Sequence, residues 1–250
     1  MRLFSNDLGI DLGTSNILIY VDGSGIVIRE PSVVAVDRNT GKILQVGSAA
    51  KNMLGRTPGN VVAMHPLKDG VISDHEMTVK MLQTLFDAVS HSPLFTPKPR
   101  VVICVPSGVT EVEERTVINA AIEAGARRVY LIEEPLAAAL GAGLDISGPR
   151  GHMVVDIGGG TTDIAVLTMN GVAASASIKT AGAAFDDAII RYVRREYSAI
   201  IGQATAEEIK IQIASAYPMG EEKQIEVKGR DLVTGIPQAI TITSEEVRKA

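Results

Sequence analysis

The chain has 250 residues, of which 46% are hydrophobic and 21% charged, values typical of a globular protein with one large core or two modest ones. A net charge of −5, without any run of Lys or Arg, argues against nucleic acid as a partner. No apolar stretch could span a bilayer and no signal peptide opens the chain, so we expect a cytoplasmic protein.

Few residue types in this chain could bind a metal through sulfur or nitrogen. The four histidines are scattered without the spacing of zinc ligands. The single cysteine, Cys104, lies in the apolar run Val101–Val105 and cannot form a disulfide within one chain. We expect it to be a small buried hydrophobic residue rather than a nucleophile.

The first motif follows the amino terminus, in Leu8–Tyr20. It reads as a strand, the carboxylate of Asp11, a glycine, the hydroxyls of Thr14 and Ser15, and a second strand. Residues 32–66 then predict a small insertion, with strands at 32–36 and 43–46 and a short helix at 47–53.

A helix follows that insertion, and then a proline-rich loop. Ser73 and Glu76 have the spacing of a capping box at the start of the helix, whose apolar residues recur at helical spacing from Met77 to Val89. Three prolines exclude a helix over 92–99. The Leu94-Phe95 pair of this loop either tucks under the neighbouring helix or dips into a membrane surface.

Residues 100–143 alternate between strands and helices. The expected elements are a buried strand at 100–105, a helix from a Thr110–Glu113 capping box to about Gly125, a strand at 129–132 and a helix opened by Pro135. This order predicts a mostly parallel sheet with right-handed crossovers. Glu133 and Glu134 would lie where strand meets helix, either facing a cleft or only stabilising the helix dipole.

The stretch Met153–Leu167 repeats the first motif in a stronger form. Two apolar strands flank Asp156, three glycines (Gly158 to Gly160), two hydroxyls (Thr161, Thr162) and Asp163. We expect the glycines to supply positive φ angles in a hairpin turn, where backbone N–H groups can bind a phosphate and Asp156 can hold magnesium through water. The competing interpretation is a glycine-rich hairpin without a ligand. Two copies of such a hairpin predict two similar lobes that clamp a nucleotide.

The remaining residues predict an α/β region. An amphipathic helix follows Gly182, with Phe185 and Tyr192 on its apolar face, and Thr205 is expected to cap a second helix. On that helix Glu207 and Lys210 read first as solvated surface charges. Strands at 223–228 and 239–243 precede a helix that opens at Ser244, so the chain looks cut short.

Three motifs together resemble a known family. Asp11–Asn16, Glu133–Ala139 and Asp156–Asp163 are similar to the phosphate-1, connecting and phosphate-2 motifs of the actin-like ATPases, and within them to the MreB/Mbl bacterial actins. The resemblance covers the whole chain. It implies an α/β, actin-like (ribonuclease H-like) ATPase fold with two lobes, each a mixed sheet flanked by helices. The first lobe would be 1–146, and the incomplete second lobe 147–250, with an insertion at 183–250.

The resemblance also implies roles for single residues. Asp11 and Asp156 would hold the Mg²⁺ shell, and Glu134 would orient the attacking water with help from Thr161. Leu94 and Phe95 would form a membrane-insertion loop. The nucleotide-binding residues it implies are Gly13, Thr14, Ser15, Asn16, Gly158, Gly159, Gly160, Thr161, Thr162, Gly182, Glu207 and Lys210.

The implied function is that of an ATP-hydrolysing cytoskeletal filament. Such a protein would bind ATP or ADP with Mg²⁺, polymerise with itself on the inner face of the cell membrane, and organise the cell-wall elongation machinery. The alternative is a non-polymerising ATPase of the same fold, such as a chaperone or a small-molecule kinase. Ala181 stands where the family usually has a second glycine, and the family continues for roughly 80–90 residues beyond residue 250. We therefore expect this 250-residue form to bind nucleotide weakly or not at all.

Overall fold

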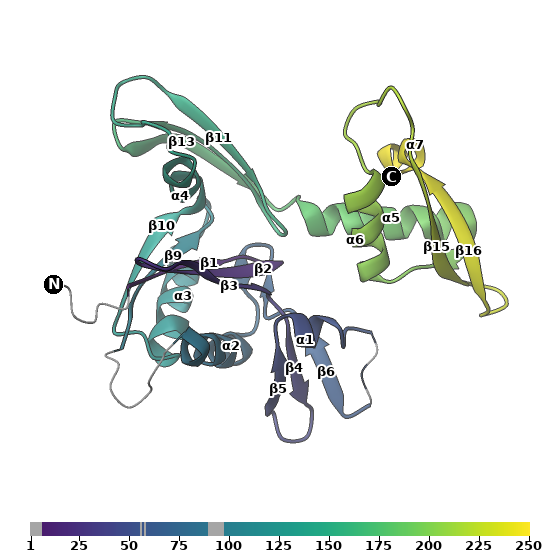
Figure 1. Cartoon of the computed structure of the whole chain (residues 1–250), viewed down its shortest axis with the longest axis horizontal. Helices are drawn as coiled ribbons and strands as arrows, with labels where there is room; N and C mark the ends of the chain where they lie inside the picture. The colour runs from purple at the N-terminus through teal and green to yellow at the C-terminus, as the bar shows by residue number, and fades with distance from the viewer. Residues whose placement is uncertain (1–6, 56, 58, 90–97) are drawn as a thin grey trace. The chain divides into compact units, whose positions relative to one another are not determined.

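The computed structural model describes residues 7–55, 57, 59–89 and 98–250 (Figure 1). These residues form two compact units, one up to Lys179 and one from Thr180 onward. The division falls there because the second predicted hairpin, after Gly151, packs on a helix of the first unit. The lobe boundary expected near residue 147 stays a prediction.

The first unit is built on a five-stranded mixed sheet in the order β10-β9-β1-β2-β3. The β1–β9 and β9–β10 pairs are parallel, whereas the β1–β2 and β2–β3 pairs are antiparallel, so the sheet is mixed rather than mostly parallel. The antiparallel half exists because the short turn after Leu12 returns the chain beside β1. Its strands are β1 (Asp7–Leu12), β2 (Asn16–Val21), β3 (Gly25–Pro31), β9 (Arg100–Val105) and β10 (Arg128–Glu133).

Helices cover both faces of this sheet. α2 (His75–Val89) and α3 (Glu111–Glu123) lie on one face and α4 (Glu134–Gly141) on the other (Figure 1). The predicted apolar face of α2 is confirmed, since Met81 and Leu82 are fully buried against the sheet. Burying one such side chain contributes about 1.5–3 kcal/mol, so this layer anchors the strands that carry the site.

The two capping boxes expected in this unit had different outcomes. Thr110 Oγ1 accepts a hydrogen bond from Glu113 N, and the Glu113 side chain accepts one from Thr110 N, so the Thr110–Glu113 box is confirmed. The prediction of a Ser73–Glu76 box was wrong. Asp74 Oδ1 accepts from Met77 N at 3.0 Å, while Ser73 Oγ donates to the Pro66 carbonyl and Glu76 pairs with Lys80. A carboxylate one residue later in the chain displaces the serine from the cap.

The insertion at 32–66 folds on its own small core. A three-stranded sheet in the order β5-β4-β6 packs with α1 around Val33, Ala35 and Ala50. The strand β6 was missed, and the expected helix at 47–53 is shorter. The elements of the insertion are β4 (Val34–Asp37), β5 (Ile43–Val46), α1 (Ser48–Lys51) and β6 (Val61–Met64), and the two-stranded ribbon that follows consists of β7 (Leu67–Lys68) and β8 (Val71–Ile72).

The second hairpin belongs to an antiparallel three-stranded sheet. Its strands are β11 (His152–Ile157), β12 (Thr162–Thr168) and β13 (Gly171–Ile178). One face packs on α4 through Ala139, Ala165 and Leu167, all buried. α4 therefore contacts both this sheet and strand β10 of the larger one.

The second unit has helices packed on a three-stranded sheet, β14-β15-β16. Its core includes Tyr192 as expected, but Phe185 is 45% exposed rather than buried. The cap expected at Thr205 was wrong, because the helix already begins after Gly202 and Thr205 lies in its first turn. The elements are α5 (Gly182–Tyr197), β14 (Ala199–Ile200), α6 (Gln203–Ile213), β15 (Gln224–Asp231), β16 (Pro237–Thr243) and α7 (Ser244–Lys249).

Candidate functional site

The first predicted phosphate turn connects β1 to β2. A Cβ on Gly13 would lie 2.7 Å from the carbonyl oxygen of Asn16, so no other residue fits there without backbone movement. The buried side chain of Ser32 donates to the Gly13 carbonyl at 2.6 Å, and Ser32 N donates to the Ser15 carbonyl at 3.0 Å. The turn is therefore held from behind by the chain entering the insertion.

The second predicted phosphate turn connects β11 to β12. Gly158 N donates to the Thr161 carbonyl at 2.9 Å, and the strands on either side place Asp156 opposite Asp163. The expectation of positive φ at these glycines was wrong, because Gly158, Gly159 and Gly160 all lack it. Their small size serves another purpose.

That purpose is contact between the two turns. A Cβ on Gly159 would lie 2.0 Å from Ser15 Oγ, and one on Gly160 would lie 2.5 Å from Thr14 Oγ1. The phosphate-1 and phosphate-2 turns, which are far apart in the sequence, thus lie against each other. Thr14, Ser15, Gly159 and Gly160 are brought together as one surface of hydroxyls and bare backbone.

A third loop joins them at Gly70, which the sequence reasoning did not single out. Gly70 N donates to Thr14 Oγ1 at 2.9 Å, and its φ of +77° favours glycine. A Cβ there would also lie 2.7 Å from Thr161 Cγ2 and 2.8 Å from the Pro106 ring. The Asp69-Gly70 dipeptide is a turn signal that could have located this loop.

Four acidic side chains surround these turns. Burial, followed by the charges of Asp163, Asp11 and Asp156, raises the pKa of Glu134 to about 8. Burial and then the charge of Asp156 raise the pKa of Asp11, and burial and then the charge of Asp163 raise that of Asp156. Each carboxylate opposes the ionisation of its neighbours, which is the electrostatic setting that a divalent cation relieves.

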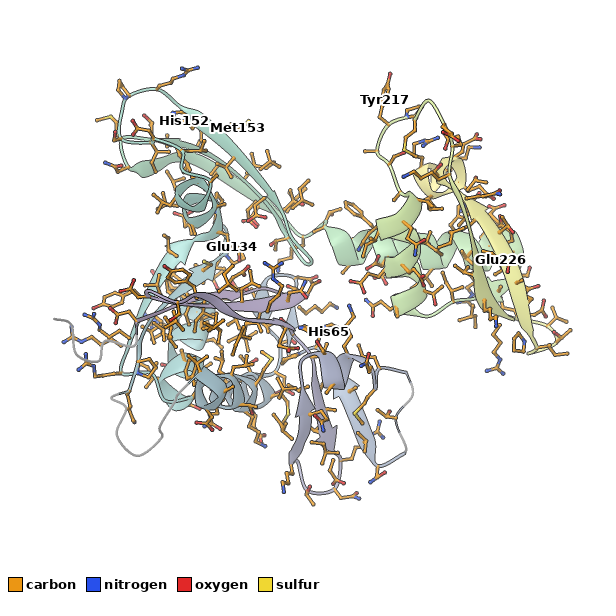
Figure 2. The ribbon with its side chains drawn as sticks, viewed as in Figure 1. His65, Glu134, His152, Met153, Tyr217 and Glu226 are labelled. Carbon is orange, nitrogen blue, oxygen red and sulfur yellow. The ribbon has the colours of Figure 1, made fainter. Side chains whose placement is uncertain are left out.

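Glu134 occupies the junction that the sequence predicted. It is the first residue of α4, directly after β10, and Pro135 occupies the first turn (Figure 2). Across the sheet, Cys104 pairs in register with Asp11. Burial and the charges of Asp11, Glu134 and Asp156 raise the pKa of Cys104 to about 12, so its thiol stays protonated and unreactive at neutral pH.

Asp163 is a site residue to which the sequence reasoning gave no role. It is only 1% exposed, and its Oδ1 accepts from Ser107 N at 3.0 Å. Its Oδ2 and the Ser107 hydroxyl have no hydrogen-bond partner within the described part of the chain. A buried carboxylate left half satisfied, beside Glu134, places an acceptor where a water or ion would complete it. Its position as the last acid of the phosphate-2 stretch was the available signal.

The donor set fits magnesium better than a directly chelated transition metal. In the ranges that the structure describes, no group of three or more His, Cys, Asp or Glu side chains could hold a metal ion. Asp11 and Asp156 offer hard carboxylate oxygens only, and magnesium commonly keeps most of its waters and takes one or two carboxylates. The two predicted metal residues therefore fit a water-mediated Mg²⁺ shell.

Three predicted nucleotide residues lie in the second unit. Lys210 Nζ donates to the Gly182 carbonyl at 2.9 Å and pairs with Asp186 Oδ1 at 2.8 Å. Glu207 lies close enough to Asp186 for its charge to raise the pKa of that carboxyl, after the larger effect of burial. The structure thus gathers Gly182, Glu207 and Lys210 on one side of α5 and α6.

The predicted membrane residues, Leu94 and Phe95, lie outside the described residues. No helix in the described ranges has the length and hydropathy needed to cross a membrane.

Comparisons with known proteins match almost the whole chain. Residues 5–250 match the family model described as MreB/Mbl protein. The chain is 52% identical over 248 residues to the cell shape-determining protein Mbl of Bacillus subtilis, covering 99% of this chain and 74% of that protein. It is 54% identical over 252 residues to the cell shape-determining protein MreB of Escherichia coli, covering 99% of this chain and 73% of that protein.

Solved structures match equally broadly. MreB5 of Spiroplasma citri bound to AMPPNP superimposes with a TM-score of 0.89 at 42% identity, covering 97% of this chain and 73% of that one. The same protein bound to ADP gives a TM-score of 0.90. A chain of the MamK double helical filament, at 22% identity, has a TM-score of 0.79 and shows the shared fold alone.

Proposed function

The chain belongs to the MreB/Mbl family, and we propose that it is a filament-forming bacterial actin that binds and hydrolyses ATP and acts in cell shape. The actin-like fold expected from the sequence is confirmed by its match to solved MreB5 structures. The observation that carries the proposal is the meeting of two glycine turns beside three partly buried carboxylates, Asp11, Glu134 and Asp156.

Phosphate binding is assigned to these two turns. Backbone N–H groups and small hydroxyls can bond phosphate oxygens without competing side chains. The relative MreB5 of Spiroplasma citri has been solved with AMPPNP and with ADP, which supports a nucleotide as the ligand. The residues we propose for the phosphates are Gly13, Thr14, Ser15, Asn16, Gly158, Gly159, Gly160, Thr161 and Thr162.

Magnesium is assigned to Asp11 and Asp156. When bound, Mg²⁺ would supply positive charge to phosphate oxygens that become more negative during transfer. The two carboxylates would hold its water shell rather than the ion itself. Their raised pKa values have the same origin as their fit to a cation, namely burial beside other negative charges.

Hydrolysis is assigned to Glu134 with Thr161. With a pKa of about 8, the Glu134 carboxyl is a stronger base than an ordinary glutamate and can accept a proton or hydrogen bond from an attacking water. Thr161 is 7% exposed, so its hydroxyl can hold that water in a fixed direction. Phosphoryl transfer requires positioning and electrostatic help rather than a covalent intermediate with the protein.

Contacts to adenosine are assigned to Gly182, Glu207 and Lys210. Self-association into filaments, attachment to the inner membrane face through Leu94 and Phe95, and work with the cell-wall elongation machinery complete the proposal. Similarity to relatives named as cell shape-determining proteins supports this role.

The test is phosphate release and sedimentation of the purified chain with ATP and Mg²⁺. We expect Glu134→Gln to lower turnover by at least 100-fold while ATP still binds, because an amide cannot accept the proton of the attacking water. Glu133→Gln, which changes the same group one residue earlier, serves as the matched control and should retain turnover.

The same samples separate the two functions weighed from the sequence. ATP-dependent pelleting supports a polymer. Turnover without any pelleted protein would indicate a non-polymerising ATPase, and full turnover in Glu134→Gln would refute the role of Glu134.

A further inference from the structure

Helices α5 and α6 of the second unit are joined by an ion pair in addition to their apolar contacts (Figure 1). The Asp186 side chain is 8% exposed and the Lys210 side chain 22% exposed, and the pair is 2.8 Å apart. Lys210 also donates to the carbonyl of Gly182, the first residue of α5, at 2.9 Å. One lysine of α6 is thus held by a hydrogen bond to a carbonyl and by an ion pair with a carboxylate, both from the first two turns of α5.

The ion pair is not needed to hold α5 and α6 together. Ile189 and Val193 of α5 already pack with Ile209 of α6 in one buried cluster. Burying a carboxylate beside them costs desolvation, and a buried ion pair is often no more stabilising than two well-packed apolar side chains. The ion pair is therefore better explained by its effect on the position of the Lys210 ammonium.

The geometry leaves Lys210 directed rather than neutralised. An ammonium has three N–H donors: one donates to the Gly182 carbonyl, and the Asp186 carboxylate lies 2.8 Å from the nitrogen as an ion-pair partner without hydrogen-bond geometry. The hydrogen bond and the ion pair together hold the ammonium in one place, and the 22% exposure of the side chain leaves it accessible to a ligand. Glu207, one helical turn earlier on α6, shares this side of the helix pair.

We propose that Asp186 is a positioning residue for nucleotide recognition: together with the Gly182 carbonyl, it aims the ammonium of Lys210 at the nucleoside part of ATP. The inference rests on the proposed function, because it takes Lys210 as an adenosine contact. A fixed donor loses less conformational entropy on binding than a mobile lysine would. Asp186 thereby acts through Lys210 and not on the phosphates.

The experiment measures binding of ATP and of inorganic tripolyphosphate, both with Mg²⁺, to the full chain by calorimetry. Tripolyphosphate has the phosphates without the nucleoside. We expect Asp186→Asn to weaken ATP binding about tenfold while tripolyphosphate binding changes less than twofold. Asp187→Asn removes the same charge from the neighbouring exposed position and should change neither.

Two further variants separate positioning from folding. Lys210→Met should weaken ATP to the same extent as Asp186→Asn, and the double variant should lose nothing more, because both changes remove one interaction. Asp186→Glu, which keeps the charge, should return ATP affinity to within about threefold of the unchanged chain.

Several outcomes would overturn the proposal. Equal weakening of both ligands in Asp186→Asn would show that the pair only supports the fold, and unchanged ATP affinity would show that Lys210 needs no positioning. If the unchanged chain bound neither ligand, the proposed function would fail and this inference with it. ATP bound normally by both the unchanged chain and Asp186→Asn would refute the inference alone.

Discussion

At the scale of single residues, the site depends on the absence of side chains at Gly159 and Gly160. The two positions differ in what they touch. The would-be Cβ of Gly159 meets the Ser15 side chain first, at 2.0 Å, and the Ser15 backbone N only at 3.1 Å. The would-be Cβ of Gly160 lies 2.9 Å from two backbone atoms, the Asp69 Cα and the Gly70 N. A side chain can be removed by mutation and a backbone cannot, so the two glycines should respond differently to rescue.

We expect Gly159→Ala to destabilise the chain by about 1–3 kcal/mol through overpacking. Ser15→Gly in the same chain should recover most of that loss, but should not rescue Gly160→Ala. The measurement is the free energy of unfolding in denaturant without nucleotide. Gly141→Ala, in α4 with no atom within 4 Å, is the control and should be neutral or stabilising. A Gly159→Ala chain that Ser15→Gly leaves unimproved would contradict contact between the turns.

Glu134 links the chemistry of the site to its stability. Its pKa rises from 4.5 in the unfolded chain to about 8 in the folded one, so the folded state binds its proton more tightly. Stability from this group is therefore lost as pH rises between 4.5 and 8. A carboxylate held ready for a cation and a water is destabilising while neither is bound.

The expected consequence is that Glu134→Gln stabilises the nucleotide-free chain at pH 8 by roughly 1–2 kcal/mol but not at pH 5. Gln cannot ionise, so its stability should not fall over this range on account of residue 134. Thermal unfolding at several pH values in a chelator measures the difference. Equal stability of the two proteins at pH 8 would show that burial and the neighbouring carboxylates do not raise the pKa of Glu134.

At the scale of elements, two hairpin turns in different units share one construction. In Asp37–Lys42 and Asp231–Ile236, the aspartate Oδ1 accepts from two backbone N–H groups and from the hydroxyl of the threonine three residues later. A glycine with positive φ then closes each turn, Gly41 in one and Gly235 in the other. The shared pattern Asp-x-x-Thr-Gly therefore fixes both turns locally.

Removing the threonine hydroxyl should loosen each turn separately. We expect Thr40→Val and Thr234→Val each to lower the free energy of unfolding by about 0.5–1.5 kcal/mol. Amide hydrogen exchange should rise only in the turn that is changed. Thr241→Val, on the exposed side of β16, is the control for the loss of a strand hydroxyl. If a single substitution raised amide exchange in both turns, the claim that each turn is stabilised by its own hydrogen bonds would be wrong.

The same hydrogen bonds make the stability of the two turns depend on pH in the acid range. Bonds from the backbone and side chain of Thr40 lower the pKa of Asp37, and those of Thr234 lower the pKa of Asp231, each below the ordinary 3.8. The folded carboxylates thus add stability above that value, which is lost as pH falls through their folded pKa.

At the scale of the whole molecule, attachment to a membrane is the part of the proposal with the clearest visible readout. We expect the chain with ATP and Mg²⁺ to form filaments on an anionic lipid monolayer, seen by negative-stain microscopy. Changing Leu94 and Phe95 to Ser should remove filaments from the lipid, because two apolar side chains no longer insert.

The matched control changes another exposed apolar pair, Leu232 and Val233, which are 42% and 88% exposed at a turn of the second unit. Their replacement by Ser should leave filaments on the lipid. Filaments that stay on the monolayer after the Leu94 and Phe95 changes would refute the membrane role of that loop.

Features that depend on neighbouring residues along the chain could be predicted from the sequence. Both glycine hairpins, the apolar face of α2 and the Thr110 capping box were predicted correctly, because strand alternation, helical spacing and caps act over a few residues. The family was also predicted correctly, from the resemblance of three motifs to those of known proteins. Where two local candidates competed, as Ser73 and Asp74 did for one helix start, the choice was wrong.

Features that depend on contact between distant segments could not be predicted in this way. The glycines of the second turn are small because Ser15 and Thr14 lie against them, and not because the turn needs positive φ. The burial of Asp163 beneath Ser107 N and the raised pKa of Glu134 likewise come from strands far apart in the sequence. Close approach and shared electrostatics are properties of pairs, and which pairs form is settled only when the sheets pack.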